Sequence, residues 1–139
     1  MQTASRSDPA RGGTALHPSG TARSDLALSL GVAAGEFVFV SGAVAFHPET
    51  GEIVGRGVEE QTRQTLHNIE AVLAEADLGF VDVVQARIYL SDIRRDFRSF
   101  DAVYREFLSA PFPARTTVGV ELAVPGLLVE IDAVARRRA

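Results

Sequence analysis

The chain of 139 residues contains no cysteine, which excludes disulfide bonds, thiolate catalysis and zinc sites built on cysteine. It contains no lysine either, because all 14 basic residues are arginine, and this excludes a Schiff-base lysine and a covalently linked pyridoxal phosphate. No run of 18 apolar residues is present, so no transmembrane helix and no membrane partner are expected. The N-terminus lacks the apolar segment of a secretory signal, and we therefore expect a cytoplasmic protein.

Acidic residues outnumber basic ones by 18 to 14, which gives a net charge of −4 and argues against a nucleic-acid partner. The composition is 46% hydrophobic with a mean hydropathy of +0.09, which is typical of one globular domain. The three histidines, His17, His47 and His67, do not have the spacing of metal ligands, so no metal site is expected.

The first 25 residues are rich in small and polar residues and contain few large apolar ones. Such a segment buries too little apolar surface to offset the entropy lost on ordering. We therefore expect residues 1–25 to form a flexible N-terminal extension and residues 26–139 to form the folded domain.

Hydrophobic periodicity within that domain predicts the order β-β-β-α-β-α-β-β, and the class is α+β. The strand at Phe37–Val40 is continuously apolar, which indicates a central strand covered on both faces. The expected strands are 26–34, 37–40, 52–54, 81–90, 115–122 and 127–135, and the expected helices are Glu59–Asp77 and a second one spanning Phe97–Leu108.

Two helices can cover only one face of the predicted mixed sheet, and self-association is the simplest way to cover the other. Strand alternation places Arg115 and Thr117 on the same face of their strand. In the next strand, it places Glu130 on the face opposite to the one that carries the apolar residues. We expect these three polar residues to share one face, at a cleft between subunits, where ligand pockets often occur.

Arg115 and Glu130 are the two residues whose setting suggests chemistry. Pro111 and Pro113 restrict the backbone just before Arg115, which favours an arginine held at the start of a strand. Glu130 interrupts an apolar strand, where a carboxylate is costly unless it is paired, hydrated or facing a ligand. A held cation suits an anionic ligand, and a carboxylate suits proton transfer.

Six segments of the chain, in order and with matching gaps, resemble the RidA (YjgF) family over residues 26 to 138. The resemblance implies a chorismate-mutase-like domain that forms homotrimers with ligand clefts between subunits. It also implies hydrolysis of 2-aminoacrylate-type enamines and imines to 2-keto acids and ammonia, without a metal or other cofactor. The segments are FVFVSG (37–42), HPETG (47–51), QTRQTLHN (61–68), VQARIYLSD (84–92), FPARTTV (112–118) and VEIDAVA (129–135).

Carried over by position, Arg115 matches the arginine that binds the substrate carboxylate, and Glu130 matches the glutamate that orients the attacking water. The resemblance assigns ligand hydrogen bonds to the backbone around Gly42 and at Thr116–Thr117.

The chain departs from the family pattern at three ligand-binding positions. It has Leu28 where many members have tyrosine, Ala43 where glutamine is frequent, and Asp101 where asparagine is found. These changes favour a larger or more apolar substrate, because two polar groups are lost.

Alternative functions follow from the same residues. A specialised enzyme could act on a bulkier unsaturated acid, and a non-catalytic trimer could bind a small carboxylate through Arg115. Alternatively, Arg115 and Glu130 could serve only as an interface ion-pair partner and a solvated carboxylate. An endoribonuclease, an activity sometimes attributed to the family, is disfavoured by the net charge of −4 and by the absence of a basic-aromatic stripe.

Overall fold

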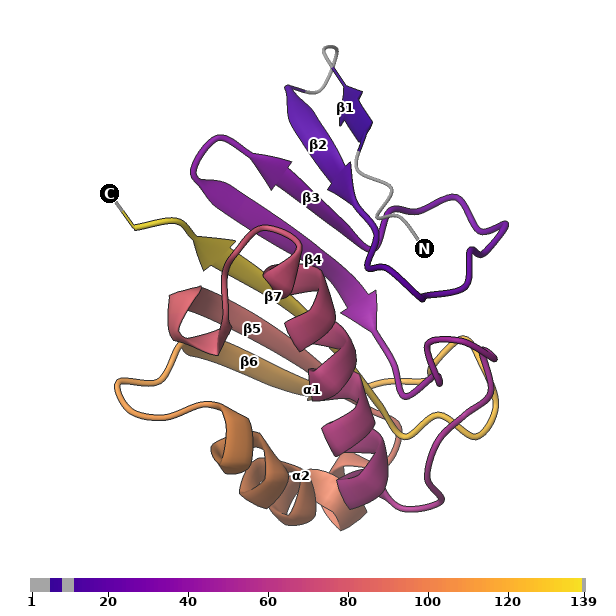
Figure 1. Ribbon diagram of the computed structural model, residues 1–139. Coiled ribbons are helices and arrows are strands. Elements are labelled where there is room, and N and C mark those ends of the chain that lie inside the picture. Colours follow the sequence, from indigo (N-terminus) through magenta and orange to yellow (C-terminus); the bar gives the residue numbers. More distant parts are fainter. Residues whose placement is uncertain (1–5, 9–11, 139) are drawn as a thin grey trace.

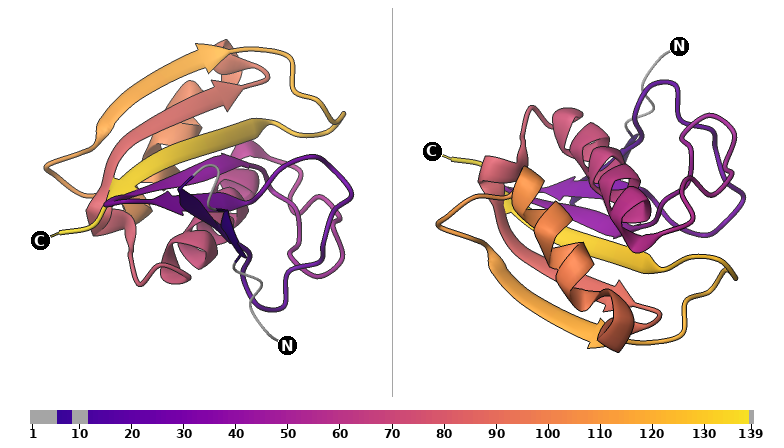
Figure 2. Two further views of the ribbon diagram at one scale, coloured as in Figure 1. Left: turned by 90° about the horizontal axis from the view of Figure 1, so that it is seen from above. Right: turned by 90° about the horizontal axis from the view of Figure 1, so that it is seen from below.

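The computed structural model describes residues 6–8 and 12–138, which form a seven-stranded sheet with two helices on one side (Figures 1 and 2). The order of strands across the sheet is β1-β2-β3-β4-β7-β5-β6. Within these residues no helix is long and apolar enough to cross a membrane. The elements are β1 (Arg6–Asp8), β2 (Gly13–Leu16), β3 (Gly31–Ala34), β4 (Phe37–Ala43), α1 (Val58–Ala74), the 3-10 helix η1 (Phe80–Asp82), β5 (Val83–Leu90), α2 (Ile93–Phe107), β6 (Ala114–Gly119) and β7 (Val129–Arg136).

Strand pairing is antiparallel throughout except between β5 and the edge strand β6, which run parallel. Parallel neighbours need a crossover connection, and α2 supplies it. The register pairs Arg115 of β6 with Ala86 of β5. Paired residues project to the same side of a sheet, so this register decides which face Arg115 occupies.

The hydrophobic core lies between the helices and one face of the sheet. The predicted stripe of α1 is confirmed, because Leu66, Ile69 and Leu73 are at most 1% exposed. Ile88 of β5 and Ile131 of β7 are equally buried beneath them. The α+β class, with two helices on one face of a mixed sheet, is therefore as the sequence predicted.

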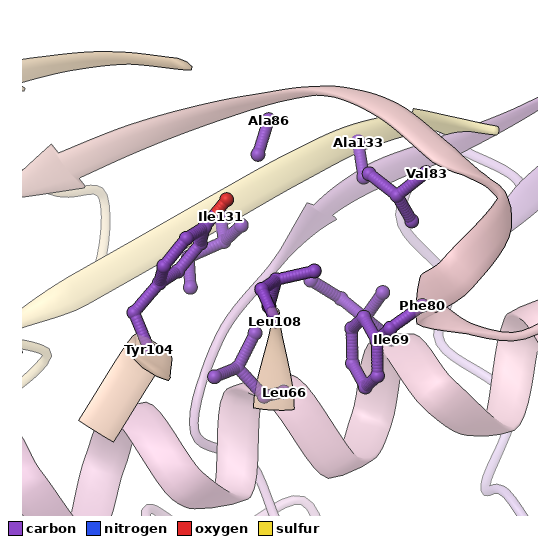
Figure 3. A pocket seen from close by; sticks show the side chains of 9 residues that line it. All are labelled: Leu66, Ile69, Phe80, Val83, Ala86, Tyr104, Leu108, Ile131 and Ala133. Atoms are coloured by element: carbon purple, nitrogen blue, oxygen red, sulfur yellow. The ribbon is translucent and has the colours of Figure 1, made fainter. Parts of the chain in front are cut away.

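The space left inside this core is small, about 10 Å³, and its lining is apolar (Figure 3). This is about the room that one water needs, whereas sites for organic ligands occupy hundreds of cubic ångströms. Tyr104 projects its hydroxyl group into this layer, towards Ala86 and Ile131, and Oη has no hydrogen-bond partner among the described residues. Among the described residues, this pocket therefore offers no room for an organic ligand.

The other face of the sheet is open in the single chain. Val38 and Val40 of β4 are buried at 0% and 4% exposure, but Phe37 and Phe39 are 37% and 47% exposed. The prediction that this strand is covered on both faces is therefore wrong for the isolated chain. The continuous apolar run arises because each face of β4 carries large side chains.

Two further predictions about the strands need correction. Gly13–Leu16, placed in the expected extension, is a strand that pairs with Gly31–Ala34, and Leu16 is buried in the core. Conversely, residues 52–54 form no strand, because Ile53 makes only an isolated bridge with Phe46. Four described strands therefore precede α1, where the sequence pattern predicted three. Met1–Ser5, the part of the extension before β1, lies outside the described residues.

The basic C-terminal residues are bound to the body of the domain. Arg136 pairs with Glu36 at 3.3 Å, and Arg138 pairs with the buried Asp82 at 3.1 Å. Arg137 Nη1 donates to the carbonyl of Ala76, just beyond α1, at 3.0 Å. A cation near a helix C-terminus is favourable. These arginines therefore anchor the end of β7.

Gln61 of α1 joins two loops that lead to the candidate site. Its Nε2 donates to the carbonyls of Gly55 and Gly126 at 3.2 and 2.9 Å, and its Oε1 accepts from the Leu128 amide at 2.8 Å. The residue is 1% exposed. It therefore holds the start of β7, two residues before Glu130.

We expect Gln61→Ala to lower the free energy of unfolding by about 2–4 kcal/mol, because three backbone groups lose their partner. Chemical denaturation measures this change. Gln64→Ala is the control on the same helix, since Gln64 bonds only to the side chain of Asn68 among the contacts described, and it should cost about 0.5 kcal/mol. Equal effects of the two substitutions would contradict the role given to Gln61.

Candidate functional site

Arg115 lies on the helix-covered side of the sheet, in the edge strand β6, and contacts α2. It is the second residue of β6, as the two preceding prolines predicted. Its Nη1 donates to Oδ1 of Asp101 on α2 at 2.7 Å, and the two side chains are 22% and 27% exposed. The cation is thus partly shielded but still reaches the surface.

Three aromatic rings of α2 surround the Arg115 guanidinium. Its central carbon lies 4.9 Å from the ring centre of Tyr104, 5.5 Å from that of Phe100 and 5.8 Å from that of Phe97. Cation–π contacts at these distances favour a positive charge and restrict the side chain. The spacing of these aromatic residues along the predicted second helix gave no indication of this cage.

Asp101 belongs to the same group, which sequence reasoning left open. The hydrogen bond from Arg115 lowers the pKa of Asp101 more than burial raises it, so this carboxylate is ionised at neutral pH. Its Oδ2 also accepts from Arg105 Nε, at the longer distance of 3.3 Å. Asp101 therefore lies between a held arginine and an exposed one.

Glu130 lies on β7 and packs against Gly42 of β4. A Cβ atom at Gly42 would overlap the Glu130 carboxylate, so glycine permits this close approach and any other residue would require the carboxylate to move. Burial raises the pKa of Glu130, and the nearby charge of Asp132 raises it further. A half-buried carboxylate with a raised pKa is suited to accepting a proton.

Three polar residues beside Glu130 were missed by sequence reasoning. Arg87 Nε and Tyr89 Oη both donate to the Asp132 carboxylate at 2.9 Å. The hydrogen bond to Asp132 raises the pKa of Tyr89. Alternation places Asp132 on the same face of β7 as Glu130, but which residues of β5 lie beside them could not be foreseen without the register.

Leu28 belongs to an irregular segment beside the group formed by Glu130 and Gly42. The amide and hydroxyl groups of Ser41 donate to the carbonyls of Leu30 and Ser29, which attaches the segment to the strand carrying Gly42. Leu28 itself is 54% exposed. An apolar side chain is therefore presented near the Gly42–Ala43 end of β4.

The expectation that Arg115, Thr117 and Glu130 share one face is wrong. Thr117 pairs with Ile88, which is buried under the helices, whereas Glu130 pairs with Tyr89 on the open face. The parallel register of β6 causes this difference. One chain therefore brings together Arg115 with Asp101 and Glu130 with Gly42, but it does not bring these two groups to one face. Thr116 lies on the open side of β6, opposite to its neighbour Thr117.

The fold is an α+β domain, a mixed sheet with two helices on one side, and it carries a charged group on each face. A family model described as Endoribonuclease L-PSP matches residues 22–137. The crystal structure of the YjgF gene product of E. coli superposes with a TM-score of 0.78 at 32% identity, covering 86% of this chain and 94% of that one.

Curated relatives agree with the structural comparison. A RutC family protein of Saccharolobus solfataricus is 41% identical over 109 residues, which are 78% of this chain and 86% of that protein. The human 2-iminobutanoate/2-iminopropanoate deaminase is 34% identical over 98 residues, which are 70% of this chain and 71% of that protein. The chain belongs to the RidA (YjgF) family.

The raised pKa of Glu130 predicts how the stability of the protein depends on pH. In the folded state the group binds its proton more tightly than at its ordinary pKa of 4.5, so its contribution to stability is lost as the pH rises through the raised value. We expect Glu130→Gln to be more stable than the parent at neutral pH. The gain should vanish below the ordinary pKa.

Denaturation curves at several pH values measure this difference. Glu70→Gln is the matched control, because the Glu70 side chain is 56% exposed, and its effect should not follow this pH window. A Glu130→Gln variant less stable than the parent at neutral pH would show that the carboxylate is stabilised, not penalised, by its surroundings.

Proposed function

We propose that this protein is an imine deaminase that hydrolyses 2-aminoacrylate-type enamines and imines to 2-keto acids and ammonia. The observation that carries the proposal is the Arg115 guanidinium, held by α2 and still 22% exposed. Relatives at 34% and 37% identity that are named 2-iminobutanoate/2-iminopropanoate deaminases support the reaction class.

Arg115 binds the substrate carboxylate in this proposal. One N–H of the guanidinium is directed to Asp101. A guanidinium carries five N–H donors, so enough remain for a carboxylate of the ligand. The aromatic cage fixes the plane of the cation, which reduces the entropy lost when the ligand binds.

Glu130 orients the attacking water and accepts its proton. The water oxygen bonds to the imine carbon, and the Glu130 carboxylate takes the proton that is released. Starting from the protonated imine, Glu130 then returns this proton to the nitrogen of the addition product and takes the proton of the new hydroxyl group as the carbon–nitrogen bond breaks, so ammonia leaves with the bonding electrons and a 2-keto acid forms. A carboxyl group with a raised pKa exchanges its proton more readily near neutral pH.

The proposed site is completed by a second copy of the chain. Arg115 and Glu130 belong to opposite faces of the sheet, so Arg115 of one copy must meet Glu130 of another. The open face offers exposed apolar side chains for such an association, among them Phe39 at 47% and Val118 at 41% exposure. The homotrimer expected for the family would provide this arrangement around a threefold axis.

The side chain of the substrate is accommodated by apolar positions. Leu28 and Ala43 provide no polar group, and Leu28 is exposed for contact with a ligand or a neighbouring chain. Backbone groups at Gly42 and Thr116–Thr117 supply the remaining hydrogen bonds. These apolar positions favour imines with longer aliphatic side chains over the smallest ones. Polar side chains at the same positions would leave less room for a long substrate and would lose bound water when it binds.

A carboxylate-binding protein without catalysis is the second candidate. The separation of Glu130 from Arg115 within one chain favours it if the chain does not self-associate. Carboxylate binding that requires Arg115, with no hydrolysis of any imine tested, would establish this alternative.

The first prediction from the proposed function is that Arg115→Ala abolishes imine hydrolysis. An amino-acid oxidase generates imines from small and large amino acids, and semicarbazide trapping reports how long they persist. The parent protein should shorten the imine lifetime, whereas the variant should act like buffer because the carboxylate loses its anchor. Full activity of the variant would refute the proposal.

The second prediction concerns two inactive variants, Arg115→Ala and Glu130→Gln, which should restore activity when they are co-expressed. If each site takes Arg115 from one copy and Glu130 from the next, random assembly makes about a quarter of the sites complete.

Co-expression of the parent chain with the double variant distinguishes the two arrangements. Sites shared between copies should again give about a quarter of the activity, whereas sites within one chain should give about half. No recovery in the mixture of single variants, with half activity in this control, would place both residues in one chain.

A further inference from the structure

We propose that Asp101 binds the cationic nitrogen of a ligand whose carboxylate is bound by Arg115. The pair would then select zwitterionic 2-imino and 2-amino acids over simple carboxylates. This inference rests on the proposed function only in taking Arg115 as the carboxylate anchor.

The geometry provides two opposite charges side by side at the surface. Asp101 Oδ1 lies 2.7 Å from Arg115 Nη1, and both side chains remain about a quarter exposed. An ionised carboxylate has about four acceptor positions, so one bond to Arg115 leaves others open. A 2-imino acid carries its nitrogen on the carbon next to its carboxylate, which matches two adjacent partners of opposite charge.

The second partner of Asp101 can be displaced by a ligand. Arg105 Nε lies 3.3 Å from Oδ2, and the Arg105 side chain is 63% exposed. Exposed ion pairs of this kind contribute little to stability. A cationic ligand nitrogen can therefore take the place of Arg105 at small cost.

Asp101 is not needed to orient Arg115, because the rings of Tyr104, Phe100 and Phe97 already contact its guanidinium. For a simple carboxylate, Asp101 is a disadvantage, since like charges repel at this range. Only a ligand with its own positive charge beside the carboxylate gains from both residues. The ionised state of Asp101, favoured by the Arg115 hydrogen bond, agrees with this role.

The same contact would help the reaction. A negative charge beside the imine nitrogen favours its protonated form, which is the stronger electrophile. The nitrogen keeps its proton next to Asp101 while the water oxygen adds to carbon and Glu130 accepts the water proton. Glu130 then gives that proton to the nitrogen and takes the hydroxyl proton as the carbon–nitrogen bond breaks, so the nitrogen leaves with the bonding electrons as ammonia.

The experiment compares the binding of L-alanine and propionate, two probes with the same carbon chain that differ in the ammonium group. NMR titration measures both dissociation constants for the parent and for Asp101→Asn. The asparagine variant should bind propionate more tightly and alanine more weakly. We expect the ratio of the two constants to shift by about tenfold, the effect of one charge-assisted hydrogen bond.

Two further variants serve as controls. Glu106→Gln changes another carboxylate of α2, one that pairs with Arg63, and it should leave the ratio unchanged. Arg115→Gln should weaken both probes. Thermal unfolding of every variant confirms that the fold is retained.

An unchanged ratio in Asp101→Asn, or no binding of alanine by the parent, would overturn the inference. Its failure is distinct from that of the proposed function, because probe binding needs no turnover. Imine hydrolysis that depends on Arg115, together with an unchanged ratio, would refute only the role of Asp101. A shifted ratio without hydrolysis of any imine would refute only the deaminase.

Discussion

The parallel pairing of β6 with β5 is the constraint on which the candidate site depends. It follows from the α2 crossover, which returns the chain to the sheet beside the strand it has just left. The resulting register aligns Arg115 with Ala86 and so directs the arginine towards α2, where Asp101 and three aromatic rings receive it. The same crossover thus provides both the cation and its surroundings. A change in this register by one residue would transfer Arg115 to the open face and separate it from all four partners.

The two faces of the sheet stabilise charged groups to different extents. This difference supports the separate roles that we propose for Arg115 and Glu130. On the helix side, Arg115 is compensated by Asp101, and the hydrogen bond from Arg115 lowers the pKa of Asp101, so the Asp101 carboxylate keeps its charge near neutral pH. On the open side, Glu130 is penalised by burial and by the negative charge of Asp132, and its pKa is raised. A compensated pair suits the binding of charged groups, and a penalised carboxylate suits the transfer of a proton. Because the two environments lie on opposite faces, the hydrolysis that we propose would take place at a centre shared by two chains.

The sequence predicted much of the fold, because periodicity identifies the buried side of each long element. The stripe of α1 through Leu66, Ile69 and Leu73 and the alternation of β7 around Ile131 are as expected. The errors concern relations between elements. Gly13–Leu16 has too few apolar residues to be recognised alone, yet the ladder with β3 and the burial of Leu16 hold it in the sheet. Alternation likewise gave the two faces of each strand correctly, but it could not say which face of β6 matches which face of β7. The cage around Arg115 was missed for the same reason.

The contacts of Asp101 change how its departure from the family pattern, in which asparagine is found at this position, is interpreted. Taken alone, a carboxylate near an anion-binding arginine only weakens the attraction for a ligand. Asp101 lies 2.7 Å from Arg115 and its second oxygen contacts the exposed Arg105, so in our proposal it supplies the negative charge that binds the ligand nitrogen. Asparagine at this position could donate to a ligand or accept from Arg115, but it would not distinguish a zwitterion from an anion by charge. In the role that we propose for Asp101, aspartate in place of asparagine exchanges strength of carboxylate binding for selectivity towards nitrogen-bearing acids, which are the compounds that an imine hydrolase must separate from its own 2-keto acid products.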